Sequence, residues 1–173
     1  MEIIPGRLVL DEKKRYLVAM YRLLCKKEEI TRGQRMLLDI VDSRKMAALC
    51  RDYDLSFNFT YKVAIGGNIP PSRLIFTLKN QIHPALWFYT EQEKEPELRQ
   101  YEPVTDLWNY RESIAFRQLS GISDLKNWCI YHHNLHYTSL WLIASGKREP
   151  SYQKIRELRD IIYPADWFYR GKI

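Results

Sequence analysis

Four side chains with metal-ligand chemistry cluster in one stretch, namely Cys129, His132, His133 and His136. Helical spacings of three and four would place Cys129 beside His132 and His133, and Cys and His are the usual ligands of zinc. Cys129, however, aligns with Leu49 in an internal repeat of the chain, which predicts a core position. His136 falls in a turn, so the four residues do not make a tetrahedral set. We therefore expect neither a metal site nor any other cofactor.

The sequence lacks the motifs that assemble common catalytic sites. It contains no GxSxG elbow, no glycine-rich phosphate loop and no HExxH pair of metal ligands. Its acidic residues are scattered, without a spacing that would pair two carboxylates for acid–base catalysis. We therefore expect a protein that is not an enzyme.

Composition indicates a folded helical protein with a moderate basic excess. Of its 173 residues, 46% are apolar and 13% are aromatic, which is enough for packed cores. Seven Gly and eight Pro are too few for a sandwich of many strands, so an all-α fold is expected. The net charge of +6 and the pI near 9.2 suit a nucleic-acid partner, although many proteins reach such values without one.

The cysteines and the apolar runs bear on the compartment. Cys25, Cys50 and Cys129 form an odd, scattered set without a CxxC pair, which favours a reducing compartment over a disulfide framework. The N-terminal segment lacks the long apolar core of a signal peptide. No apolar stretch approaches the roughly 18–20 residues of a bilayer span. These features predict a cytoplasmic protein with no membrane partner.

The chain contains an internal sequence repeat. Residues 55–89 align with residues 135–169 at an offset of 80, without a gap, and 12 of the 35 positions are identical. The shared residues are mostly apolar or turn-forming, and they include Trp87 and Trp167, which we expect in the core. The chain therefore contains one small unit built twice.

Four regions follow from the repeat and from the local patterns. They are an N-terminal helical extension at 1–30, a first unit at 31–89, a charged linker at 90–104 and a second unit at 105–173. In the first unit Thr31 and Ser43 are expected to cap helices, and the next helices are predicted at about 57–65 and from Pro70-Pro71 to 82. In the second unit the predicted helices are 105–119, 124–133, 137–145 and 150–162.

Each unit contains a helix, a three-residue turn and a second short helix, which is the pattern of a helix-turn-helix. A buried aliphatic residue fills the turn, another returns the second helix to the core eight positions later, and a glycine ends that helix in a left-handed conformation. These roles fall on three pairs of residues: Leu55 and Leu135, Val63 and Ile143, and Gly66 and Gly146.

The segment after the second turn carries a more specific pattern. Gly146-Lys147-Arg148-Glu149-Pro150-Ser151, followed by Tyr163-Pro164-Ala165-Asp166-Trp167-Phe168, resembles the phage repressor/Cro-like (XRE-type) helix-turn-helix family. Phe116-Arg117-Gln118-Leu119 with Gly121-Ile122-Ser123 is similar to that family's entry into its second helix. The resemblance covers 105–169 and reaches 31–89 through the repeat. It implies two tandem five-helix lambda-repressor-like units, each placing its third helix in the major groove of duplex DNA.

The resemblance also implies which residues contact DNA. In the second unit these are Lys126 at the start of helix two, Tyr137, Thr138, Ser139 and Leu142 on the recognition helix, and Lys147 and Arg148 at the phosphates. In the first unit they are Asn58 and Lys62, since Asn can pair with adenine and Lys with guanine. Arg111 and Arg117 are expected to be solvated helix-face charges.

The chain departs from the family pattern on its recognition helices, which are rich in aromatic residues. The first unit also has Gly67-Asn68 where the second has Lys147-Arg148, so it is interpreted as a degenerate reader. We expect a sequence-specific, repressor-like transcriptional regulator that binds double-stranded DNA. The alternative is a protein-interaction module that kept the fold and uses exposed Phe57, Phe59, Tyr61 and Trp141. A homodimer or another protein partner remains open, as does the role of residues 1–30.

Overall fold

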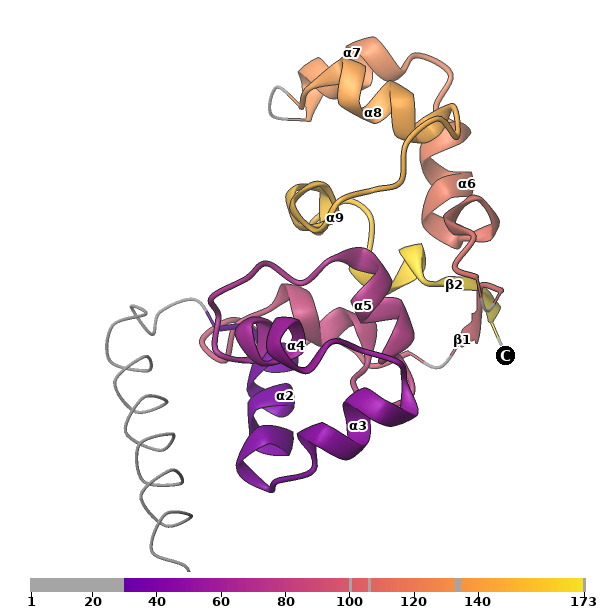
Figure 1. Ribbon diagram of the computed structural model, residues 1–173. Coiled ribbons are helices and arrows are strands. Elements are labelled where there is room, and N and C mark those ends of the chain that lie inside the picture. The colour runs from indigo at the N-terminus through magenta and orange to yellow at the C-terminus, as the bar shows by residue number, and fades with distance from the viewer. Residues whose placement is uncertain (1–29, 100, 106, 133–134, 173) are drawn as a thin grey trace, which may run out of the picture.

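The computed structural model describes residues 30–99, 101–105, 107–132 and 135–172. The predicted N-terminal helical extension at 1–30 lies outside these residues except for Ile30. Helices dominate the described part of the chain, and one small two-stranded sheet accompanies them (Figure 1). The helical fold expected from composition is confirmed, and the sheet is an addition that was not predicted. No helix among the described residues has the length and apolar character needed to cross a bilayer.

The order of elements repeats along the chain. The first repeat consists of α2 (Arg32–Asp42), α3 (Met46–Asp52), α4 (Phe57–Ala64), α5 (Ser72–Thr77) and the 3-10 helix η2 (Pro84–Phe88). The second consists of η3 (Tyr110–Glu112), α6 (Ile114–Ser120), α7 (Leu125–Tyr131), α8 (Tyr137–Ala144), α9 (Tyr152–Leu158) and η4 (Pro164–Trp167). Helices α8, α9 and η4 begin 80 positions after α4, α5 and η2, so the repeat in sequence is also a repeat in structure.

Side-chain caps set most of the helix starts. Thr31 begins α2 with a capping box, because its hydroxyl accepts from the Gln34 amide while the Gln34 side chain accepts from the Thr31 amide. The Gln34 side chain also donates to the Val63 carbonyl at 3.0 Å, which ties α2 to the end of α4. The predicted cap at Ser43 is wrong. Its hydroxyl instead donates to the Ile40 carbonyl at the end of α2, and Lys45 precedes α3 without a side-chain cap.

The helix predicted at 105–119 is broken in two. Residues 107–109 are not helical, and Trp108 among them has a left-handed φ of 41°. The short helix η3 follows, and the extended residue Ser113 separates it from α6. Ser113 then starts α6 afresh by accepting a hydrogen bond from the Phe116 amide at 3.0 Å. The Trp108 side chain is buried and stacks on Phe168 with the ring centres 5.8 Å apart.

Strands β1 (Tyr101–Pro103) and β2 (Tyr169–Lys172) form the antiparallel sheet at one side of the molecule (Figure 1). Tyr101 and Tyr169 are both buried and meet edge to face at 5.8 Å. Strand β1 lies within the segment predicted as a linker, and Val104 in the same segment is buried and donates its amide to the Phe168 carbonyl. This stretch therefore packs against the folded repeats.

Two tryptophans occupy the centres of the repeats. Trp87 and Trp167 are 0% exposed, which confirms the prediction that both are core residues. Val63 and Ile143 are buried at equivalent points of α4 and α8, and Cys129 is buried as its alignment with Leu49 predicted. The turn residues Leu55 and Leu135 are half-buried and pack against this core.

Helices α4 and α8 both end at a glycine with positive φ, as predicted. The φ of Gly66 is 79° and that of Gly146 is 74°. Residues other than glycine are disfavoured in this conformation, because their Cβ atom approaches the following carbonyl oxygen. These two glycines let the chain reverse direction after each short helix.

Gly66→Ala should lower the free energy of unfolding by about 1 kcal/mol through backbone strain alone. A Cβ at this position would lie 3.8 Å from the nearest atom, a methylene carbon of Ile30, so no clash contributes. Gly171→Ala is the matched control, because a Cβ there meets nothing within 4 Å and φ is not in the left-handed region. In urea unfolding, the midpoint concentration of the Gly66 variant should be lower than that of the control. Equal midpoints would contradict the strain assigned to Gly66.

Candidate nucleic-acid interface

Helix α4 is anchored by one face and presents the other to solvent. The Ser56 hydroxyl caps it by accepting a hydrogen bond from the Phe59 amide at 3.5 Å. The buried face consists of Thr60, Val63 and Ala64, and the helix contacts α2 and α3. The exposed face consists of Phe57, Asn58, Phe59 and Lys62.

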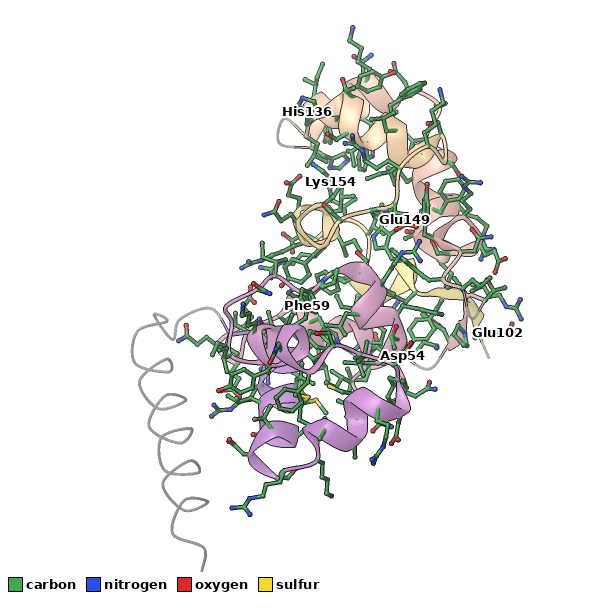
Figure 2. The ribbon with its side chains drawn as sticks, viewed as in Figure 1. Asp54, Phe59, Glu102, His136, Glu149 and Lys154 are labelled. Carbon is green, nitrogen blue, oxygen red and sulfur yellow. The ribbon has the colours of Figure 1, made fainter. Side chains whose placement is uncertain are left out.

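Helix α8 is built in the same way at the equivalent position. His136 takes the place of Ser56 as the cap, and its Nδ1 accepts from the Ser139 amide at 3.4 Å and lies 3.1 Å from the Ser139 hydroxyl. Leu140 and Ile143 form the buried face. Figure 2 shows His136 in the part of the molecule that holds α7 and α8, away from Phe59 of the first repeat. The capping role of His136 was missed, although its alignment with Ser56 was the available signal.

The residues predicted to contact DNA lie mostly on the surface. Seven of them are exposed: Lys126, Tyr137, Thr138, Lys147, Arg148, Asn58 and Lys62. Ser139 and Leu142 are half-buried. The contact between α7 and α8 brings Lys126 into the same substructure as the α8 residues, whereas Asn58 and Lys62 belong to a separate surface on α4.

An ordered positive charge lies where α8 ends. The Lys147 ammonium is 4.4 Å from the centre of the Trp141 ring, which is 40% exposed, so the two form a cation–π pair. Trp141 is therefore not a core residue. In the first repeat the corresponding Tyr61 is half-buried, and Phe57 stacks on it with the ring centres 6.3 Å apart.

Arg111 and Arg117 are exposed, as expected, and each also donates a hydrogen bond to a backbone carbonyl. The Arg111 guanidinium donates to the Gly146 carbonyl at 2.5 Å and supports the turn that follows α8. Arg117 donates to the carbonyl of Arg170 and links α6 to strand β2. Each guanidinium thus donates to a backbone carbonyl of another part of the chain.

Acidic side chains are excluded from the stretches that carry the two exposed helices. Residues 55–90 contain Lys62, Arg73 and Lys79 but no Asp or Glu, and residues 125–148 contain Lys126, Lys147 and Arg148 but no Asp or Glu. The chain as a whole has 21 acidic residues, so both gaps are long for its composition. The two stretches thus contain only positive and neutral side chains, although acidic residues flank both directly and Arg73 is paired with Glu149.

The two repeats meet through residues that occupy equivalent positions. Phe88 and Phe168, which are 80 positions apart, are both buried with ring centres 6.5 Å apart. His83 packs on the ring of Tyr169 at 5.8 Å, and the exchanged pair, Tyr163 and Tyr89, is close enough to interact electrostatically. The Phe88–Phe168 contact joins equivalent positions, as an approximate twofold relation between the repeats would place them.

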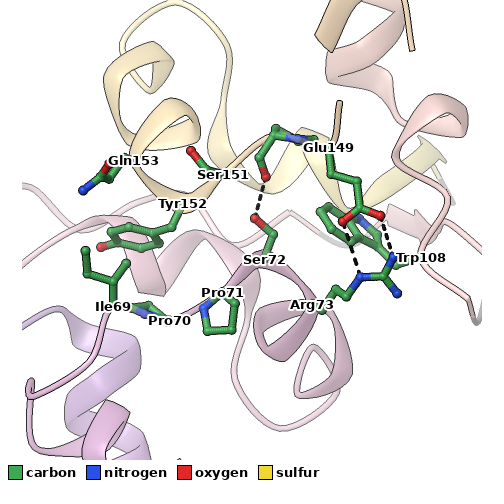
Figure 3. Close-up of a pocket in the computed structure, with 11 residues that line it drawn as sticks. Ile69, Pro70, Pro71, Ser72, Arg73, Trp108, Glu149, Ser151, Tyr152 and Gln153 are labelled. Atoms are coloured by element: carbon green, nitrogen blue, oxygen red, sulfur yellow. Dashed lines mark hydrogen bonds and ion pairs between the residues drawn. The ribbon is translucent and has the colours of Figure 1, made fainter. Parts of the chain in front are cut away.

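A cleft of about 480 Å³ shows the same relation (Figure 3). It is lined by residues 69–73 from the first repeat, by the equivalent residues 149–153 from the second and by Trp108. The Ser72 hydroxyl donates to the Pro150 carbonyl at 2.8 Å, and the Arg73 guanidinium pairs with the Glu149 carboxylate at 2.5 Å.

Two longer side chains of the second repeat reinforce this interface. The Tyr152 hydroxyl donates to the Trp87 carbonyl at 2.8 Å, and the Arg159 guanidinium donates to the Phe88 carbonyl at 2.7 Å. Tyr152 also stacks on Phe88 at 4.9 Å. The two repeats are therefore held in one relative orientation by aromatic packing and hydrogen bonds together.

His83 is neutral at this interface for geometric reasons. Its Nε2 lies 2.9 Å from the Arg99 carbonyl, which can only accept, and its Nδ1 accepts from the Ala85 amide at 3.2 Å. Nε2 therefore carries the hydrogen and Nδ1 does not. Burial lowers the pKa of His83 below its ordinary value, which outweighs the opposing effect of the hydrogen bond to Arg99.

Stability should fall when His83 is protonated. Because the folded pKa is the lower one, the unfolded chain takes up the proton first, so the free energy of unfolding decreases as pH falls below about 6.5. His83→Asn keeps an oxygen that can cap Ala85 but cannot titrate. Between pH 7.5 and pH 5, urea unfolding should show a larger loss for the wild type than for the variant. Equal losses would contradict the neutral assignment.

Neither a metal site nor a similarity to known proteins indicates the function of this chain. No group of three His, Cys, Asp or Glu side chains in the described ranges is placed to hold a metal ion, and His133 lies outside those ranges. No protein-family model, curated protein or solved structure matches this chain. The exposed faces of α4 and α8 and the charge around them are therefore the basis for a function.

Proposed function

We propose that the chain is a sequence-specific, repressor-like DNA-binding regulator in which α3 with α4, and α7 with α8, act as two helix-turn-helix units. The observation that carries this proposal is the pair of equivalent capped helices, each anchored by one face, exposed on the other and set in a stretch without acidic side chains. A helix of this kind fits the major groove of duplex DNA, where base edges can be read.

In the second unit α8 is the recognition helix. Tyr137 and Thr138 stand exposed at its first turn, the part of a recognition helix that contacts base edges. The hydroxyl of Ser139 is engaged by His136, which orients it beside them. Lys147, positioned by the Trp141 ring, and Arg148 supply phosphate contacts that hold the helix in register without reading sequence.

The relation between the repeats suggests how the target is arranged. A twofold relation maps α4 onto α8 in the manner of the two subunits of a repressor dimer, so the half-sites would run in opposite directions about one helical turn, roughly 34 Å, apart. Since α4 and α8 carry different exposed side chains, the half-sites would differ in sequence. Occupying such a site within a promoter would block transcription by occlusion.

A fluorescence-anisotropy titration against mixed-sequence duplex DNA tests the proposal. About four to six phosphate contacts predict a slope of about −4 to −5 for the logarithm of affinity against the logarithm of salt concentration. Affinity should therefore fall roughly a hundred- to a thousandfold between 50 and 200 mM salt. Binding that is absent, or insensitive to salt, would reject the proposal.

Lys147→Ala should weaken binding to all duplex sequences alike and reduce the salt slope by about 1, because it removes one phosphate contact. Lys94→Ala is the matched control, since it removes the same charge from an exposed position in the segment between η2 and β1. Adding Arg148→Ala to the first variant should deepen the loss, whereas Thr138→Ala should instead change base preference. Equal slopes for the Lys147 and Lys94 variants would remove Lys147 from the interface.

A second candidate, a protein-interaction module, is favoured by one observation. Several large apolar side chains are exposed near the same helices: Phe57, Phe59, Ile130, Tyr131, Tyr137 and Trp141. Tyr131 is the most extreme at 84%. Exposed apolar groups of this kind are common at protein interfaces. In the salt titration this function predicts no DNA affinity, which separates it from the first.

A further inference from the structure

Two phenylalanine rings occupy the first turn of α4 on its exposed side. Phe57, the first residue of the helix, is 48% exposed, and Phe59 is 38% exposed. Phe57 is also supported from behind, because it stacks on Tyr61 with the ring planes only 4° from parallel. The Phe57 ring is therefore held on the surface by this contact, although exposure of large apolar groups is unfavourable in water.

A phenylalanine ring has no hydrogen-bond donor or acceptor with which to read a base. The major-groove edges of the base pairs display donors, acceptors and one apolar group, the C5-methyl of thymine. An apolar side chain at the start of a recognition helix can therefore distinguish thymine from cytosine only through that methyl group.

The charge around α4 favours DNA as the occupant of this surface. Asn58 and Lys62 are exposed on the same helix, and residues 55–90 carry three basic side chains and no acidic one. Arg73 is paired with Glu149, so Lys62 is the exposed basic residue on α4 itself. The phosphates of DNA complement this charge and the absence of acidic residues from the stretch. The rings thus lie on a helix whose charge matches a duplex.

We propose that Phe57 selects half-sites that contain thymine by packing against the C5-methyl group in the major groove. This inference rests on the proposed function and deepens it, because it names the chemical feature that the first unit reads. The second unit reads differently, since the equivalent Tyr137 carries a hydroxyl and is followed by the polar Thr138. The chain therefore combines one half-site read by apolar contact with another read by hydrogen bonds.

The test compares thymine with deoxyuridine, which differs only by the missing methyl group. A preferred duplex is first selected from a random pool with the full chain, and thymines are then replaced by deoxyuridine in one half-site at a time. For the wild type the Kd should rise about fourfold for each methyl group that Phe57 covers, the value expected for one buried methyl-sized group. The other half-site should respond less.

Three variants make the result specific to Phe57. Phe57→Ala should bind the thymine and deoxyuridine duplexes equally, with a Kd near that of the wild type on deoxyuridine. Met36→Ala is the matched control, because it removes an apolar side chain of similar exposure, 39%, from α2. It should keep the full thymine preference, and so should Lys94→Ala, which removes an exposed charge from the segment between η2 and β1.

Different failures point to different errors. Three results would overturn the role of Phe57 and leave the proposed function standing. The wild type could bind the thymine and deoxyuridine duplexes with equal affinity, or the preferred half-site could contain no thymine. The third result is a thymine preference that persists in Phe57→Ala. If the chain binds no duplex at low salt, the proposed function falls together with this inference. If the chain binds no DNA but self-associates, and Phe57→Ala abolishes this self-association, the two rings belong to a protein interface.

Discussion

The packing of Phe88 against Phe168 is the contact on which the arrangement of the molecule depends. These two rings occupy the same place in their repeats, and burying both of them at one interface brings η2 and η4 together. Tyr152 and Arg159 then hydrogen-bond to the backbone of the first repeat. The orientation of α4 relative to α8 follows from this contact, because each helix is fixed to its own core.

Within each repeat, the same logic fixes the exposed helices. A tryptophan fills each core, an aliphatic residue such as Val63 or Ile143 draws the short helix inward, and a glycine lets the chain turn away. One face of the helix is thereby committed to packing. The exposed face of the helix makes few contacts with the core, so its residues can differ between the repeats without disturbing the fold. The exposed side chains of α4 and α8 differ for this reason.

Much of this could be predicted from sequence because it depends on local pattern. The repeat at an offset of 80, the capped start at Thr31 and the left-handed glycines all leave signals in residue type and spacing. The stacking of Trp108 on Phe168 and the edge-to-face contact of Tyr101 with Tyr169 could not be predicted, since both join distant segments of the chain. The relative orientation of the repeats was likewise inaccessible. It arises from contacts such as Ser72 with Pro150, which no local pattern marks.

The same division holds for the candidate site. Exposure of Thr138 and Lys147 agrees with their predicted positions, but the pairing of Lys147 with Trp141 is a tertiary contact. The central claim is that one chain presents both short helices to one duplex. Hydroxyl-radical footprinting of a selected duplex, with the stoichiometry measured on the same complex, tests it most directly. We expect one molecule to protect two segments about one helical turn, roughly 10 base pairs, apart; one protected segment per molecule, or none, would contradict the account.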